Sequence, residues 1–574
     1  MEHTDFYISK GVRRWIALYM VVSALRLWLG SLLGVWFPGE QGADDALMVL
    51  YSAFPNYFRH MTPDWLMLKE LGMPVFLQIV NFSGISYPVA LGLLWILDGF
   101  LLSRIAKKIS GREPLAFGVY VAVIFVPASL EAFCGTRMYR AGLLNPMYVM
   151  LFALCLMMLS AIREEKAGKR QLFLGLLLGL ILSFTYYIKE DGIWILAVTA
   201  AFALTWLWTL LASYFKNRDK KRLITGVVVL LLPFVILEGV TLSYKAVNYR
   251  FFGVFETNVR TSGESGAFVE KIYQIASEDR TNVVWAPKDA IEKAFKASPA
   301  LNAHPELKEA IYTSWWIDGD IDAHPIEGDF LTWILKDAVF ECSLVTNLQE
   351  KEAFFAQVNR ELDAAFQKGI LEKETTRRQI LSSVGGKTGE EVAQIAGRAL
   401  DAYGYHLLMK DYEPGGRYVT GEMSTIYLPA AIISNYNVLP LNESGAVAAR
   451  EFEIKIANLP VKGIFFLGKI LAPLLLVLAF AGSILTLVRF FRGGRKEEEL
   501  LSFTHALIFF GLLAVSYVYS FMVMLFCTEF EERFVMAEKM YSVGVVSLLL
   551  VAITLGVSLL VREIDLRKST RIQG

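Results

Sequence analysis

Apolar runs close to bilayer length recur along the whole chain, and they constrain its fold more than any other feature. About ten of them reach or approach the roughly 20 residues that cross a bilayer as a helix. Hydrophobic residues make up 55% of the 574 residues, and the mean hydropathy is +0.44. One run would be compatible with a signal peptide, but this many predict an α-helical polytopic membrane protein in a lipid bilayer. The expected spans are Trp15–Trp36, Ile85–Ala106, Leu115–Phe133, Asn145–Ile162, Leu172–Ile188, Ile193–Phe215, Leu223–Val247, Ile464–Phe490, Phe503–Phe526 and Tyr541–Val561.

The placement of basic residues indicates how these spans are oriented. The chain has 56 basic and 56 acidic residues, so its net charge favours neither nucleic acid nor an acidic partner. Cytoplasmic loops are enriched in Lys and Arg, and every second loop here is basic. We therefore expect a multi-pass protein of the cell membrane (plasma or inner) with both termini in the cytoplasm. The basic loops lie at 10–14, 104–112, 163–170, 216–222, 489–496 and 562–571.

A long polar insert divides the membrane pattern. The insert is large enough to bury its own core, and we expect it to be a mainly helical domain outside the cytoplasm. Ser298-Pro299 has the pattern of a helix start, and the apolar residues after Glu352 recur on one helical face. The expected parts are an N-terminal transmembrane module at 1–247 with a first outer loop at 37–84, the extracytoplasmic domain at 248–460 and a C-terminal transmembrane module at 461–574.

Four of the expected outer loops carry mixed acids and bases. For any single loop, ordinary charge facing the lipid headgroups is the better explanation. All four together favour a site that holds a phosphate while it removes a proton from a hydroxyl. The residues are Asp44, Asp45 and Lys69 in the first outer loop, Arg137 and Arg140 in CGTRMYRAGL, Lys189, Glu190 and Asp191 in YYIKEDGIW, and Arg533 in CTEFEERFVMAEK.

In order and type, these motifs resemble the GT-C superfamily of polyprenyl-phosphate-dependent glycosyltransferases, which includes protein O-mannosyltransferases and the aminoarabinose transferases of lipid A. GADDALM is similar to the acidic motif of the first outer loop in that family, and KELGMPVFLQI to the lysine-and-proline stretch that follows it. YIKEDGIWIL is similar to the second acidic motif, and EERF to the arginine-aromatic motif before a final span. GDFLTWILKDAVF and RELDAAFQKGIL resemble the middle domain of large uncharacterised bacterial members. The membrane resemblance covers mainly residues 1–250 and the region of Arg533.

The resemblance implies an inverting glycosyltransferase that moves a sugar from a polyprenyl-phosphate donor to an envelope glycan or glycolipid acceptor outside the membrane. Asp44 or Asp45 is implied as the general base, and the other charged residues as binding groups. One departure concerns Lys69, which four residues separate from Pro74, whereas proline often follows sooner in the family. The implied binding groups are Lys69, Arg137, Arg140 and Arg533 for the donor and its lipid phosphate, with Lys189, Glu190 and Asp191 positioning the donor or the acceptor.

The chemistry itself requires no cofactor. Polyprenyl phosphate is already a good leaving group, cations stabilise the charge that develops on it, and one carboxylate is enough to deprotonate the acceptor. The adjacent aspartates Asp44 and Asp45 could instead hold a divalent cation through oxygen ligands. Their spacing differs from a D-x-D signature, so we do not expect a metal site.

Other interpretations remain open. Asp45 could be the N-cap of a helix from Ala46 to Phe54. The chain could be a transporter or flippase of lipid-linked sugars, or a non-catalytic glycan-binding scaffold in which tryptophans of the outer domain stack on sugars. The tryptophans in question are Trp285, Trp315, Trp316 and Trp333.

One further expectation concerns two charges inside predicted spans. Arg26 lies well within the first span and Asp98 well within the second. A lone charge in the bilayer interior costs at least about 2.5 to 3.5 kcal/mol. We therefore expect Arg26 and Asp98 to form a structural ion pair.

Overall fold

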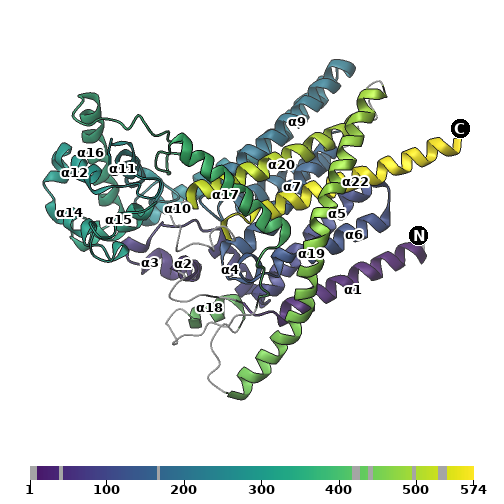
Figure 1. The fold of residues 1–574 in the computed structure, drawn as a ribbon, viewed down its shortest axis with the longest axis horizontal. Helices are drawn as coiled ribbons and strands as arrows, with labels where there is room; N and C mark the ends of the chain where they lie inside the picture. The colour runs from purple at the N-terminus through teal and green to yellow at the C-terminus, as the bar shows by residue number, and fades with distance from the viewer. Residues whose placement is uncertain are drawn as a thin grey trace, which may run out of the picture.

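The computed structural model describes residues 10–35, 37, 43–163, 168–415, 427–436, 444–493, 499–527 and 540–573. Within these residues, nine helices are long and apolar enough to cross a membrane. They form the bundle of long helices in Figure 1. The prediction of an α-helical polytopic membrane protein is confirmed. The nine are α1 (Lys10–Leu32), α5 (Tyr87–Ser110), α7 (Arg140–Arg163), α8 (Gly168–Tyr186), α9 (Ile193–Asn217), α10 (Lys220–Phe252), α19 (Ser444–Arg492), α20 (Leu500–Cys527) and α22 (Gly544–Gln573).

The third expected span, at 115–133, is not one continuous helix. Only α6 (Glu113–Ile124) is α-helical there, and it is too short to cross a membrane. A 3₁₀ turn begins at Pro127 and a π-helical turn covers Ala132–Thr136. Proline has no backbone N–H with which to continue an α-helix. A hydropathy pattern averages over this break, so the sequence predicted a single span.

The broken segment nevertheless runs between the two ends of α22. Arg112 pairs with Asp565 at 2.7 Å near the C-terminal end of α22. Arg137 donates a hydrogen bond of 3.1 Å to the sulfur of Met540, just before α22 begins. Residues 112–137 and 540–565 are stretches of equal length, so the segment covers the same depth of the bundle as α22.

Arg26 does not pair with Asp98, and the expectation of an ion pair between them is wrong. Arg26 Nε instead donates a hydrogen bond of 2.8 Å to the carbonyl of Ile124, the last residue of α6. Its Nη1 lies 3.8 Å from the position that a Cβ on Gly92 would occupy. Gly92 and Asp98 are separated by about 9 Å of helical rise along α5, so the Arg26 guanidinium lies beside Gly92 and away from the Asp98 carboxylate. Arg26 therefore satisfies a carbonyl that the break after α6 leaves without a helical partner.

Six shorter helices form a polar unit at the end of the bundle opposite the chain ends (Figure 1). As predicted, the Ser298 side chain caps a helix that has Pro299 at its first position. The predicted apolar face of Phe355, Val358 and Leu362 is buried. No β-strand occurs among the residues that the structure describes. The helices are α11 (Gly263–Gln274), α12 (Lys288–Ala297), α13 (Pro299–Asn302), α14 (Pro305–Tyr312), α15 (Phe330–Glu341) and α16 (Leu348–Gln367).

The chain returns from this unit to the bundle through α17 (Gly389–Leu408), which packs on α20. Tyr517 donates a hydrogen bond of 3.0 Å to the carbonyl of Ala396, and Ser520 one of 2.8 Å to that of Ala399. A short helix, α18 (Tyr427–Ser434), follows. Helix α19 then continues without a break for 49 residues, so the expected boundary at residue 460 falls inside one helix.

The first loop lies between the bundle and the polar unit (Figure 1) and contains α2 (Ala43–Ser52), α3 (Phe54–Arg59) and α4 (Gly72–Ser83). The amide of Gly72 donates a hydrogen bond of 2.6 Å to the carbonyl of Tyr187. A Cβ at residue 72 would lie 2.4 Å from that oxygen, so the contact requires glycine. This close approach brings the segment of Lys69 beside the segment of Glu190.

Candidate functional site

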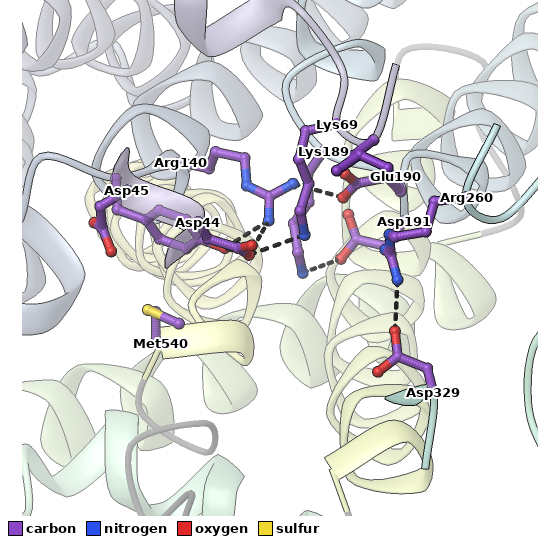
Figure 2. A network of polar contacts seen from close by, with 12 residues as sticks. Asp44, Asp45, Lys69, Arg140, Lys189, Glu190, Asp191, Arg260, Asp329 and Met540 are labelled. Atoms are coloured by element: carbon purple, nitrogen blue, oxygen red, sulfur yellow. Dashed lines mark hydrogen bonds and ion pairs between the residues drawn. The ribbon is translucent and has the colours of Figure 1, made fainter. Parts of the chain in front are cut away.

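Asp44 is the centre of the charged cluster in Figure 2. It lies in the first turn of α2, and one of its carboxylate oxygens, Oδ2, accepts three hydrogen bonds. The donors are Lys69 Nζ at 2.9 Å, the Tyr139 hydroxyl at 2.9 Å and Arg140 Nη2 at 3.0 Å. The side chain is 23% exposed, whereas those of Lys69 and Arg140 are almost fully buried. Asp44 is therefore held by two buried cations but still reaches open space.

Asp45 points away from Asp44 (Figure 2) and is completely buried. Its two carboxylate oxygens accept hydrogen bonds from Arg137, one from Nε at 3.0 Å and one from Nη2. Helix α2 begins at Ala43, so Asp45 lies within the first turn, and the alternative of Asp45 as the N-cap of a helix from Ala46 is wrong. Asp45 serves as the counter-charge of Arg137.

The cations control the ionisation of the cluster. Burial alone would raise the pKa of Asp44, but the charges of Lys69 and Arg140 outweigh it and lower the pKa below its ordinary value. Burial would lower the pKa of Arg137, but the charge of Asp45 raises it. At neutral pH, Asp44 is therefore a carboxylate and Arg137 a cation.

A second acidic segment joins the cluster through Arg140. Glu190 accepts a hydrogen bond of 2.5 Å from Arg140 Nη1, so one guanidinium bridges Asp44 and Glu190. Burial opposes ionisation of Glu190, but the charges of Arg140 and Lys69 lower its pKa. Lys189 and Asp191 pair with each other at 2.6 Å. The structure thus gathers the charges expected in three separate loops.

Residues that the sequence analysis did not assign to the charged cluster also belong here. Glu70 is buried beside Lys69, and its Oε2 has no hydrogen-bond partner among the described residues. Burial and the nearby charge of Glu190 raise the pKa of Glu70 to about 8. The ring of Trp333 lies 4.9 Å from Lys69 Nζ and 5.0 Å from the guanidinium carbon of Arg260. Glu70 adjoins a predicted residue, but no sequence pattern connects Arg260 or Trp333 with the first loop.

A cavity of about 1670 Å³ opens from this cluster. Its polar part is lined by Asp44 and by the side chains of Lys69, Arg140 and Glu190, while Asp45 does not line it. Its apolar part is lined by α9 and α20. On α20 the lining extends from Thr504 to Phe526, which is about 33 Å of helical rise. This length is close to the roughly 30 Å of a bilayer's hydrocarbon core.

Most of the predicted site residues line this cavity. Arg137, Lys189 and Asp191 line it together with the residues above. Arg533 lies outside the described residues. In the part of the chain that the structure describes, no group of three or more His, Cys, Asp or Glu side chains could hold a metal ion, and metal independence stays a prediction.

Neither a protein-family model nor a curated protein matches the chain. The site combines two features. One is a carboxylate held by buried cations. The other is the apolar part of the cavity, lined by α9 and α20, which has the length of a membrane span and is called the apolar groove below.

Proposed function

We propose that the protein is an inverting, polyprenyl-phosphate-dependent glycosyltransferase of the GT-C type. In this proposal it transfers a sugar to an envelope glycan or glycolipid on the outer face of a bacterial cell membrane. The observation that supports it best is the cavity, in which a charged cluster lies at the end of an apolar groove. A lipid-linked phosphate combines the two matching properties, because its chain needs an apolar wall and its phosphate needs cations.

The general base is assigned to Asp44. Asp44 lines the cavity and is partly exposed, so an acceptor hydroxyl can reach its carboxylate. Asp45 is fully buried, and both of its oxygens are engaged by Arg137. Asp45 is therefore a positioning residue that holds Arg137 at the edge of the cavity.

Donor binding activates this base. Lys69 and Arg140 stabilise the Asp44 carboxylate in the free protein, and they are also the buried cations best placed for a donor phosphate. When a phosphate takes over part of their charge, the pKa of Asp44 rises and the carboxylate becomes a stronger base. The low pKa of Asp44 in the free protein is thus compatible with catalysis.

The reaction is a direct displacement. The acceptor hydroxyl passes its proton to Asp44 while its oxygen forms a bond to the anomeric carbon. The bond from that carbon to the phosphate oxygen breaks on the opposite side, and its electron pair leaves with polyprenyl phosphate. Displacement from the opposite face inverts the configuration at the anomeric carbon. Lys69 and Arg140 stabilise the charge on the departing phosphate.

The experiment that tests this proposal is a transfer assay with purified protein in lipid nanodiscs. A panel of polyprenyl-phosphate sugars is supplied together with an envelope extract as the source of acceptor, and released polyprenyl phosphate is measured. Turnover that Asp44→Asn abolishes is the expected result. No release from any donor would overturn the proposal. Movement of intact lipid-linked sugar across proteoliposomes, without cleavage, would favour a flippase instead.

A further inference from the structure

Two stacked indoles lie at the edge of the cavity, in the turn between α14 and α15. The rings of Trp315 and Trp316 are 4.2 Å apart between centroids and inclined by 30°. Trp316 lines the cavity, whereas Trp315 is 60% exposed. A single exposed tryptophan needs no explanation, but this one extends an aromatic surface that begins inside the cavity.

The aromatic surface continues inward to the charged cluster. The Trp316 and Trp333 ring centroids are 5.3 Å apart. Trp333 in turn lies against Lys69, which donates its hydrogen bond to Asp44. Three indoles therefore form a continuous row from the solvent to the group that holds the proposed base. We call Trp315, Trp316 and Trp333 the tryptophan row.

The row is held rigidly at its centre and is polar at its outer end. Trp316 Nε1 donates a hydrogen bond of 3.1 Å to Asp337 on α15. Asp318 has a left-handed backbone, with φ +52°, and ends the turn that carries Trp315. Its carboxylate is 65% exposed. Asp320 and Asp322 follow in the same exposed loop, and Asp322 pairs with Lys288, so the outermost indole is followed in the chain by carboxylates that face the solvent.

Two simpler explanations do not account for the row. Packing of the core explains Trp333, which is almost fully buried, but not Trp315. An aromatic anchor at a membrane interface would explain an exposed tryptophan. However, the exposed carboxylates of Asp318 and Asp320 would be repelled by the anionic lipids of such a surface, whereas that of Asp322 is paired with Lys288.

We propose that the tryptophan row is the binding path of a saccharide chain, which is the acceptor of the transfer reaction. A pyranose ring has an apolar face of C–H groups that can stack on an indole, while its rim carries hydroxyls that donate to carboxylates such as Asp318. The role as acceptor path rests on the proposed function, but saccharide binding does not. The class of acceptor is then a glycan or the glycan part of a glycolipid.

Binding is tested with the full-length protein in nanodiscs and three soluble probes, namely hexasaccharides of glucose, N-acetylglucosamine and mannose, by saturation-transfer NMR. We expect at least one probe to bind. Trp315→Ala should weaken its binding roughly two- to tenfold, the range of one aromatic contact, and Trp315→Phe should retain most of it. Ile370→Ala, at a residue that is 65% exposed and does not line the cavity, is the control and should change nothing.

Three results would overturn the inference. The first is that no probe binds to the wild type, and the second is that Trp315→Ala leaves binding unchanged. The third is that brominated lipids quench tryptophan fluorescence in the wild type but not in Trp315→Phe, which would place Trp315 in the bilayer. Failure of the two proposals is distinguishable. Saccharide binding without donor cleavage counts against the glycosyltransferase, whereas cleavage with an acceptor KM that Trp315→Ala leaves unchanged counts against the path.

Discussion

Asp44 and Asp45 are adjacent in the chain, but their carboxylates have different partners and only Asp44 lines the cavity. Asp44 is held by Lys69 and Arg140, and Asp45 by Arg137. Successive residues of a helix point in directions about 100° apart. Helix α2, which begins at Ala43, therefore directs Asp44 into the cavity, where it is suited to chemistry, and Asp45 to Arg137, where it is suited to a structural role.

The first prediction is that Asp44→Asn removes turnover and leaves the fold intact. A positioned general base contributes about 10²- to 10⁴-fold, so turnover should fall by that range. Asp44 is partly exposed, Arg140 keeps its ion pair with Glu190, and the amide oxygen still accepts a hydrogen bond from Lys69, so the unfolding temperature should fall less than in Asp45→Asn. Single-turnover measurements with bound donor give the rate. Normal turnover in Asp44→Asn would exclude this residue as the base.

The second prediction is the reverse pattern for Asp45→Asn. The substitution removes the negative charge of Asp45 from the buried Arg137 guanidinium. Breaking a buried ion pair by removing one partner costs about 3 to 5 kcal/mol. We expect a clear fall in unfolding temperature, part of which Arg137→Gln should restore in the double variant. If Asp45→Asn is as stable as the wild type and catalytically inactive, the assignment of the base is reversed.

The third prediction concerns the donor phosphate. Lys69→Ala removes a buried charge-assisted contact of about 1.5 to 3 kcal/mol. Donor affinity should fall roughly 10- to 150-fold, as measured by titration of the wild type and variant in nanodiscs. Lys293→Ala is the control, because Lys293 forms an ion pair with Asp289 and neither residue lines the cavity. Equal donor affinity in Lys69→Ala and the control would remove Lys69 from the phosphate site.

Much of this arrangement could be predicted from local patterns. Hydropathy locates the long helices, since length and apolarity are local properties. The alternation of basic loops predicts that Asp44, Lys69 and Glu190 lie in loops at the same end of the helix bundle, because alternate loops must lie on the same side of the membrane. What such patterns do not contain is the direction of each side chain. The choice between Asp44 and Asp45 depends on which face of α2 turns towards the cavity, and nothing in GADDALM indicates that face.

Contacts between distant segments account for the rest. The sequence predicts a pair between Arg26 and Asp98 because their opposite charges lie inside predicted spans, but the break after Ile124 exposes a carbonyl that Arg26 satisfies instead. Trp333 reaches Lys69 only because α15 packs against the first loop, where Lys336 lies 3.7 Å from the ring centroid of Trp65. Packing between segments so far apart in the chain has no local sequence signal.

The fourth prediction follows from the protonation of Glu70. Burial and the charge of Glu190 raise its pKa to about 8, from an ordinary value of 4.5. The folded protein therefore keeps a proton that an unfolded glutamate loses, so ionisation of Glu70 opposes folding increasingly as pH rises through this window. Glu70→Gln should raise the unfolding temperature by an amount that grows between pH 4.5 and pH 8 and then levels off.

Thermal unfolding in detergent across this pH range measures the effect on Glu70→Gln. Glu390→Gln is the control, since Glu390 is an exposed carboxylate in the first turn of α17. The difference in unfolding temperature between Glu390→Gln and the wild type should show no comparable rise with pH. A difference for Glu70→Gln that is independent of pH would mean that folding does not raise the pKa of Glu70.

The last prediction tests the apolar groove with a matched pair of glycines. Gly511 on α20 lines the cavity, and a Cβ there would meet no heavy atom within 4 Å. Gly239 on α10 has the same open surroundings but does not line the cavity. Phenylalanine therefore adds the same bulk to a membrane helix at either position, and only Gly511→Phe fills the groove.

If the groove holds the donor's lipid chain, Gly511→Phe should raise the KM for a long-chain polyprenyl-phosphate donor. Excluding about two methylene groups at about 0.8 kcal/mol each corresponds to about tenfold in affinity. A short-chain donor that does not reach residue 511 should be used equally well by Gly511→Phe and the wild type, because the charged cluster is unchanged. Gly239→Phe should leave both donors unaffected. If both donors lose affinity equally in Gly511→Phe, the substitution acts by disturbing the fold of the charged cluster, and the groove does not hold the lipid chain.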